Sequence, residues 1–519
     1  MTGTSQLTGE LFIGATRVAG TAEPVRARDP RTGEVLEPAF GGATPEDVER
    51  AAQLAARAFR PYRLLPPARR AAFLDGAAER ISAVSDELVA RVVAETGIPP
   101  ARVRGELART VHQLRLFASV VREGSAAGVR VEHALPDREP LPRPDLRQRR
   151  VPLGPVAVFG AGNFPLAFSV AGGDTASALA AGCPVVVKAH PGHPGTSEIV
   201  AAAIAGAAAE HGVPDGVFSL LHDAGHAVGT ALVAHPAIAA VGFTGSRAGG
   251  LALLEVANRR PVPIPVHAEM SSVNPVVLLP GALAERAAEL GAAFVASMTV
   301  GQGQLCTNPG LVLAVEGPGL QGFLDAAAAA VRATAAAPML GTGTRTAFER
   351  GVAALREHPQ VQEVATGAGD ERIAAAGTTH LFTTTADAFE ADEDLSREVF
   401  GASSLVVRVP SADRLAGLLE RLEGQLTATV HLADDDHEVV RELLPVLEEK
   451  AGRIVANGWP TGVDVGRAVV HGGPFPATSD GRSTSVGTLA VERWLRPVAY
   501  QDLPAALRPP EVADDPGAG

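Results

Sequence analysis

Apolar and polar positions follow a helical pattern in the first part of this 519-residue chain and a mixed one afterwards. Between residues 44 and 96, and again over Ala101–Arg122, apolar residues recur every three or four positions, as in amphipathic helices. Thr44 and the Pro-Glu-Asp that follows it form an N-cap, a first-turn proline and first-turn acids. From Val156 onward, short apolar runs alternate with helix-like segments of about 10–15 residues, which predicts βαβ units and parallel sheets. The expected fold class is therefore α/β.

Short stretches rich in polar residues and glycine follow three of the apolar runs. They are Gly160–Asn163, Lys188–His190 and Thr244–Ser246. Because the carboxyl ends of parallel strands meet at one edge of a sheet, we expect these stretches to line a ligand site. A second α/β region continues to about Ala456, and the Gly/Pro-rich segment after it has the composition of a site-lining loop.

Residues 129–152 differ from the rest, with five prolines and many charges. This composition argues against a core element and predicts an extended arm or an exposed hairpin. Residues 506–519 are expected to form a flexible tail.

The composition of the chain argues against several classes of function. The net charge of −13 argues against a nucleic-acid or anionic-membrane surface. No apolar run is long enough to span a bilayer, and the first residues lack a secretion signal, so a cytoplasmic location is expected. Two cysteines are too few for a disulfide framework or a multi-cysteine zinc site, and no metal site is expected.

The two cysteines have different surroundings. Cys183 precedes an apolar run and fits a small buried hydrophobe. Cys306 lies among Gly, Gln and Asn, which leaves a nucleophilic role and a structural role about equally open. Glu269 ends an apolar run and is either a desolvated base or a paired carboxylate. Lys188 is one of only two lysines among 45 basic residues, which favours a specific requirement for its compact ammonium over chance.

The order and spacing of these motifs resemble the aldehyde dehydrogenase superfamily. The resemblance extends from near the N-terminus to about residue 505. Within the superfamily, three segments look most like those of the α-ketoglutaric semialdehyde (2,5-dioxovalerate) dehydrogenases. These segments are residues 162–198, 267–275 and 457–480. NADP-dependent fatty-aldehyde dehydrogenases share much of the pattern and remain the alternative. The motifs are Asn163-Phe-Pro, Lys188, Phe243-Thr-Gly-Ser, Glu269, Gly301-Gln-Gly-Gln-Leu-Cys306 and Glu398-Val-Phe-Gly.

The resemblance implies roles for the matching residues. Cys306 would attack the aldehyde, Asn163 would hold the oxyanion, and Glu269 would activate the water that hydrolyses the thioester. An acylating enzyme that passes the thioester to coenzyme A is disfavoured by Glu269, and a non-catalytic protein is disfavoured by the presence of all three residues.

The resemblance also implies a bound dinucleotide. NAD-specific relatives often carry Glu three positions after the conserved lysine, where this chain has Pro191. Loss of that carboxylate removes repulsion against a 2′-phosphate, so NADP is expected, with NAD also possible. The cofactor-binding residues expected from the matching motifs are Lys188, Gly245, Ser246, Gly250, Glu398 and Phe400.

The superfamily fold implies a Rossmann-like cofactor domain (1–128 and 153–269), an α/β catalytic domain (270–480) and a small β oligomerisation arm (129–152 and 481–505). A homodimer or homotetramer is expected. For the substrate, Phe164 and Phe475 match aromatic positions beside the family's cysteine. Arg109, on the helix nearest the expected tunnel mouth, is a candidate for holding a distal carboxylate, or is simply a solvated helix residue.

Overall fold

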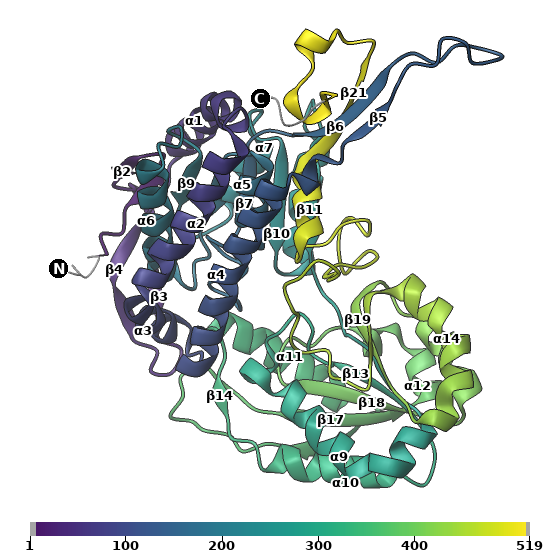
Figure 1. Ribbon diagram of the computed structural model, residues 1–519. Coiled ribbons are helices and arrows are strands. Elements are labelled where there is room, and N and C mark those ends of the chain that lie inside the picture. Colours follow the sequence, from purple (N-terminus) through teal and green to yellow (C-terminus); the bar gives the residue numbers. More distant parts are fainter. Residues whose placement is uncertain (1–6, 515–519) are drawn as a thin grey trace.

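Two seven-stranded sheets organise the structure, one in each half of the chain (Figure 1). The computed structural model describes residues 7–514. The strand orders are β11-β10-β7-β8-β9-β1-β2 and β15-β17-β18-β13-β12-β19-β20. Helices cover both faces of each sheet, which confirms the α/β class.

In the first sheet, β7 to β11 run parallel, whereas β1 is antiparallel to both β9 and β2. In β7, Val156 and Val158 pack into the core on one face, and Ala157 and Phe159 into the core on the other. Burial on both faces explains why such strands appear in the sequence as unbroken apolar runs. The strands are β1 Leu11–Ile13, β2 Thr16–Val18, β7 Val156–Phe159, β8 Val185–Lys188, β9 Phe218–Leu221, β10 Ala240–Thr244 and β11 Val266–Glu269.

Eight helices belong to this half of the described chain, and Thr44 caps the first as predicted. Its Oγ1 accepts the Asp47 backbone N–H at 3.3 Å, while the Asp47 carboxylate accepts the Thr44 N–H at 3.0 Å. The helices are α1 Pro45–Arg63, α2 Pro67–Ala83, α3 Ser85–Thr96, α4 Pro100–Glu123, α5 Gly173–Ala181, α6 Pro194–Glu210, α7 Ala227–Ala234 and α8 Arg247–Asn258.

The second sheet is parallel except for β15, which is antiparallel to β17. Helices α9 Pro280–Met298 and α10 Leu320–Arg332 cover one face. The other face is covered by α11 Thr342–Glu357, α12 Ala386–Ala391, α13 Leu415–Glu420 and α14 His437–Lys450. The strands are β12 Val276–Leu278, β13 Leu311–Val315, β15 Gln362–Thr366, β17 His380–Thr385, β18 Ser403–Val409, β19 Gln425–His431 and β20 Ala451–Ala456.

The proline-rich segment forms an antiparallel hairpin that projects from the body (Figure 1). Its strands, β5 Arg130–Glu132 and β6 Leu146–Pro152, are joined by β21 Leu495–Gln501 in a three-stranded sheet. Two smaller sheets pair β3 Ala22–Arg28 with β4 Val35–Gly42, and β14 Ala337–Pro338 with β16 Ala376–Gly377.

The segment expected to be a flexible tail packs against β6 as far as Asp514. Val512 is fully buried, and its carbonyl accepts a hydrogen bond of 2.6 Å from the buried Arg147 guanidinium. A buried guanidinium needs acceptors, and this segment supplies them. Residues 515–519 of that tail lie outside the described residues. No helix between residues 7 and 514 is long and apolar enough to cross a membrane.

Candidate active site

The site lies where strand ends of the first sheet meet a loop of the second half. Asn163 follows β7, and its Nδ2 donates to the Gln304 carbonyl at 3.0 Å, on the loop that joins α9 to β13. The Gly245 N–H, just after β10, donates to the carbonyl of Glu269, the last residue of β11. The polar stretches expected at one sheet edge therefore do converge, and the cysteine loop meets them.

Cys306, His471 and Glu269 form a continuous chain of polar contacts. His471 Nε2 lies 3.4 Å from Cys306 Sγ and 2.9 Å from Glu269 Oε1. Ser485 Oγ donates to Glu269 Oε2 at 2.8 Å. The side chains of His471 and Glu269 are buried, whereas Cys306 is half-buried. The thiol is therefore the member of this chain that an incoming molecule can reach.

A long loop after β20 positions His471. The His471 N–H donates to Thr484 Oγ1 at 2.8 Å, and the Ser485 N–H donates to the His471 carbonyl at 2.8 Å. Further along, Ser479 and Ala477 bond to the backbone beside Glu269 in β11. The imidazole and the carboxylate are thus fixed by the same segment.

The pKa values of the Glu269 carboxylate and the Cys306 thiol are shifted in opposite directions. Burial disfavours the charged form of Glu269, but the His471 ring and hydrogen bonds from Ser485 and Cys306 outweigh it, so the pKa of Glu269 falls below its ordinary value. Burial, reinforced by repulsion from Glu269, raises the pKa of Cys306 well above that of a free thiol. At neutral pH the thiol is therefore protonated, and an ionised carboxylate lies nearby to receive its proton.

The loop before Cys306 has an uncommon backbone. Gly301, Gln302 and Gly303 all have left-handed φ values of 59°, 56° and 67°. A Cβ on Gly303 would lie 2.3 Å from the backbone of Gly401, so only glycine fits. The buried Gln302 has no such freedom, and a non-glycine residue held there costs about 1–3 kcal/mol. Surrounding contacts therefore enforce this turn.

Asn274 supplies one of those contacts. Its Nδ2 donates to the carbonyls of Cys306 and Asn308, both at 2.9 Å. Its own N–H and the Ser272 hydroxyl are held by Gln425 Oε1 at 3.1 and 2.9 Å. Asn274 is fully buried. This network ties the cysteine loop to β19, which begins at Gln425.

Two arginines from different halves of the chain hold one loop beside the cysteine. Arg109 of α4 donates to the Val463 carbonyl, and Arg453 of β20 donates to the carbonyls of Pro460 and Gly462. In each guanidinium the buried Nε has no partner among the described residues. Burial lowers the pKa of both arginines, and attraction to an ionised Cys306 opposes that effect. A positive region therefore lies close to the thiol.

Aromatic rings lie beside His471 and Arg109, on the same side of the thiol. Phe164 packs edge-to-face on Phe168 at 5.3 Å between centroids, and Phe168 packs on His471 at 6.0 Å. The guanidinium carbons of Arg102 and Arg109 lie 5.2 and 5.8 Å from the centroids of Phe164 and Phe168. Arg109 is thus not a solvated helix residue but part of the wall around the thiol.

Phe475 does not join this wall. Its side chain is 56% exposed, and its carbonyl accepts the Gly424 N–H at 3.2 Å. The residue of that loop that contacts Cys306 is His471, four positions earlier. The prediction for Phe475 thus differs from the structure, because the loop turns between the two residues.

The residues expected to hold a dinucleotide occupy the first sheet. Lys188 ends β8, and burial lowers the pKa of its ammonium while Asp223 opposes the shift. Both ring nitrogens of the neighbouring His222 are buried and have no partner within residues 7–514. Pro191 is exposed three positions after Lys188. A half-buried donor and two enclosed ring nitrogens therefore lie together at the ends of β8 and β9.

The loop after β10 opens helix α8. Ser246 is the N-cap, and its Oγ accepts the Gly249 N–H at 3.2 Å. Gly245 and Ser246 are exposed, so this helix end is free to face a phosphate. Gly250 is buried instead, and a Cβ there would lie 2.7 Å from Met270 Sδ. Its position serves the packing of α8 on the chain after β11.

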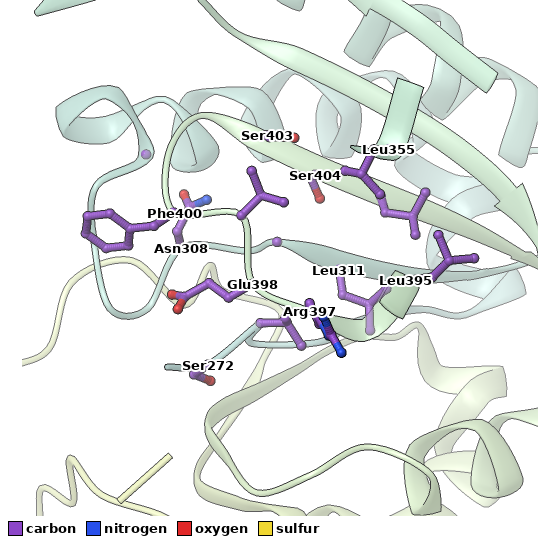
Figure 2. A pocket seen from close by; sticks show the side chains of 15 residues that line it. Ser272, Asn308, Leu311, Leu355, Leu395, Arg397, Glu398, Phe400, Ser403 and Ser404 are labelled. Carbon is purple, nitrogen blue, oxygen red and sulfur yellow. The ribbon is translucent and has the colours of Figure 1, made fainter. Parts of the chain in front are cut away.

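Glu398 and Phe400 line a small pocket beside the cysteine loop. Figure 2 shows the Glu398 carboxylate and the Phe400 ring on the same side of their loop, with Leu355 and Leu395 on the opposite side. Burial raises the pKa of Glu398 to about 8, so the group is largely a hydrogen-bond donor at neutral pH.

Three residues of the site, His471, Asn274 and Arg453, are not apparent from sequence patterns alone. His471 opens the Gly/Pro-rich segment, which signals a loop but not a contact. Asn274 and Arg453 had weak signals: an amide before a proline, and a charge within an otherwise apolar run.

Comparisons with known proteins agree with this geometry. A family model described as the aldehyde dehydrogenase family matches residues 18–473. The chain is 57% identical to alpha-ketoglutaric semialdehyde dehydrogenase 2 of Azospirillum brasilense over 97% of this chain and 96% of that protein. It is 45% identical to the alpha-ketoglutaric semialdehyde dehydrogenase of Acinetobacter baylyi, covering 98% and 97%. Its fold matches Pseudomonas syringae aldehyde dehydrogenase C bound to NAD⁺ and octanal (TM-score 0.80, 21% identity, 95% and 97% coverage).

Proposed function

This chain belongs to the aldehyde dehydrogenase family, and from that premise we propose that it oxidises 2,5-dioxovalerate (α-ketoglutaric semialdehyde) to 2-oxoglutarate with NADP or NAD. The names of the two relatives at 57% and 45% identity support the substrate. The observation that carries the chemistry is the chain of contacts from Cys306 through His471 to Glu269.

The mechanism follows from these contacts. The Cys306 thiol passes its proton to the ionised Glu269 carboxylate, to which it donates a hydrogen bond, and the thiolate attacks the aldehyde carbon. The His471 Nε2–H lies 3.4 Å from the sulfur and stabilises the thiolate, and Glu269 releases the proton to solvent before the second stage. Asn163 has one N–H bonded to Gln304, and its second N–H stabilises the oxyanion of the resulting thiohemiacetal. When bound, the nicotinamide cofactor supplies the hydride acceptor that converts this adduct into a thioester. Glu269, ionised and held by Ser485, then takes a proton from the water that hydrolyses the thioester.

The residues present fit a dinucleotide. Lys188 presents a half-buried ammonium at the end of β8. Ser246 and Gly245 expose a helix N-terminus, which favours a pyrophosphate. Glu398 and Phe400, beside the cysteine loop, would hold the nicotinamide end.

A substrate panel tests the proposal. We expect formation of reduced cofactor with 2,5-dioxovalerate at a higher kcat/KM than with hexanal, and no requirement for coenzyme A. A preference for hexanal would replace the proposal with the fatty-aldehyde alternative. Dependence on coenzyme A would instead indicate an acylating enzyme.

Arg109 is expected to hold the carboxylate of the substrate at the end away from the aldehyde. An unpaired carboxylate is costly to desolvate, and Arg109 has an unpaired Nε beside the thiol. Arg109→Ala should raise KM for 2,5-dioxovalerate by about 10–100-fold, the value of a charge-assisted hydrogen bond. Steady-state kinetics should show hexanal oxidation nearly unchanged. Arg104→Ala, on the same helix and paired with Asp86 at the surface, is the matched control. Equal losses on both aldehydes would exclude this role.

Cofactor preference is expected to depend on Pro191. Since no carboxylate stands at this position, kcat/KM for NADP should equal or exceed that for NAD. Pro191→Glu should lower kcat/KM for NADP by about tenfold or more through repulsion of the 2′-phosphate. Pro191→Gln, which has similar size and no charge, should retain the wild-type ratio. A wild-type protein strongly selective for NAD would contradict this expectation.

We further propose that the two halves act as a cofactor domain (1–128 and 153–269) and a catalytic domain (270–480). The projecting sheet (129–152 and 481–505) is proposed to pair copies of the chain in a homodimer or homotetramer. The exposed hairpin at its tip is consistent with that use.

A further inference from the structure

Cys306, His471 and Glu269 have a second chemical capacity that the oxidation of an aldehyde does not use. Thiolate, imidazole and carboxylate are the three side chains that bind zinc in proteins. One atom from each of these residues, Sγ, a ring nitrogen and a carboxylate oxygen, lies within 4.8 Å of the other two. We propose that this triad binds one Zn²⁺ ion and that zinc reversibly inhibits the enzyme.

The spacing of the three atoms suits a tetrahedral ion. With the usual zinc–ligand distances, a sulfur and a nitrogen ligand lie about 3.5 Å apart, and a nitrogen and an oxygen about 3.3 Å apart. The observed separations are 3.4 Å for Cys306 Sγ to His471 Nε2 and 2.9 Å for His471 Nε2 to Glu269 Oε1. The third pair, Cys306 Sγ and the Glu269 oxygen, lies within 4.8 Å, so movement of the Glu269 carboxylate toward the sulfur completes three vertices. Water would occupy the fourth.

The charges of the site also balance. Zinc takes the place of the Cys306 thiol proton, which leaves to solvent, and a sulfur–zinc bond forms. The thiolate and the Glu269 carboxylate together neutralise the divalent ion, and neutral His471 adds no charge. Neutrality matters because the triad is largely buried and the guanidiniums of Arg109 and Arg453 lie nearby.

The ligands are already held in place. Ser485 Oγ orients the second oxygen of Glu269, and the backbone of the same loop fixes His471. Such outer contacts orient metal ligands and reduce the entropy lost on binding. The zinc-bound state also blocks the reaction, because the sulfur that must attack the aldehyde is occupied.

Cobalt provides a test that does not depend on any aldehyde, so a wrong substrate assignment would not affect it. Titration of the metal-free full-length chain with CoCl₂ should produce one thiolate-to-cobalt charge-transfer band, and ZnCl₂ should abolish the band by displacement. Cys306→Ala should lack the band. Cys183→Ala should retain it, because Cys183 is fully buried elsewhere and bonded to the Trp494 carbonyl. His471→Gln should weaken binding by at least about 10–100-fold, the loss seen even for outer partners.

Two measurements on the wild-type protein test the proposal independently of whether the variants fold correctly. ZnCl₂ should inhibit aldehyde oxidation and protect Cys306 from alkylation by iodoacetamide, and EDTA should reverse both effects. Absence of the charge-transfer band in the wild type, or a band unaffected by Cys306→Ala or His471→Gln, would overturn the proposal. Zinc bound at surface groups without protection of Cys306 would overturn it as well.

Discussion

Cys306→Ala is expected to reduce aldehyde oxidation by at least about 10⁴-fold, the scale of removing a catalytic nucleophile. Cofactor binding, measured by calorimetry or fluorescence titration, should persist, because Lys188 and Ser246 are in the other half of the molecule. The physical reason is that Cys306 is the half-buried end of a chain whose other members are buried.

Cys183→Ala is the matched control for this result. Burial raises the pKa of Cys183 to about 11, and its Sγ donates to the Trp494 carbonyl at 3.7 Å. We expect turnover near that of the wild type, with a modest loss of stability from the small cavity. Substantial oxidation by Cys306→Ala would exclude the covalent mechanism.

Glu269→Gln should separate the two halves of the reaction. A single-turnover burst of reduced cofactor is expected to remain, since in this variant His471 Nε2 no longer donates to a carboxylate and can take the thiol proton. The steady state should slow by about 10²–10⁴-fold, because no carboxylate is left to activate the hydrolytic water. Stopped-flow absorbance measures both phases.

His471→Gln provides the complementary result. Here the burst itself should slow, because the His471 N–H no longer stabilises the thiolate of Cys306, whose pKa is already well above that of a free thiol. If Glu269→Gln instead abolished the burst while His471→Gln retained it, only the carboxylate would act as the base for the thiol, and His471 would have no part in forming the thiolate.

The α/β class and the strand ends were predictable because they depend on local periodicity. The run at Val156 is apolar at every position because both faces of β7 are buried. A run of consecutive apolar residues can be recognised from the sequence alone. Thr44 and Asp47 form their capping box across three residues. Cys306, Glu269 and Asn163 were recognisable because each lies in a short ordered motif.

The partners of those residues were decided by tertiary structure. His471 is 165 positions from Cys306 and 202 from Glu269 in the sequence. Its place depends on how an aperiodic loop folds over β11, and loop composition carries no signal for that path. The same reason explains Phe475, which belongs to the expected loop but turns away from the thiol.

The expectation about metals shows the same limit. Two cysteines argue against a zinc site built from several thiolates, and that inference follows from counting alone. A site with one cysteine, one histidine and one glutamate has no sequence spacing to recognise, because each ligand comes from a different segment. Motif order therefore singled out the groups that we propose to react, while only the packing of β11, the cysteine loop and the loop after β20 decided which groups touch. Short-range patterns record backbone conformation and burial, but a contact between distant segments exists only once the chain has folded.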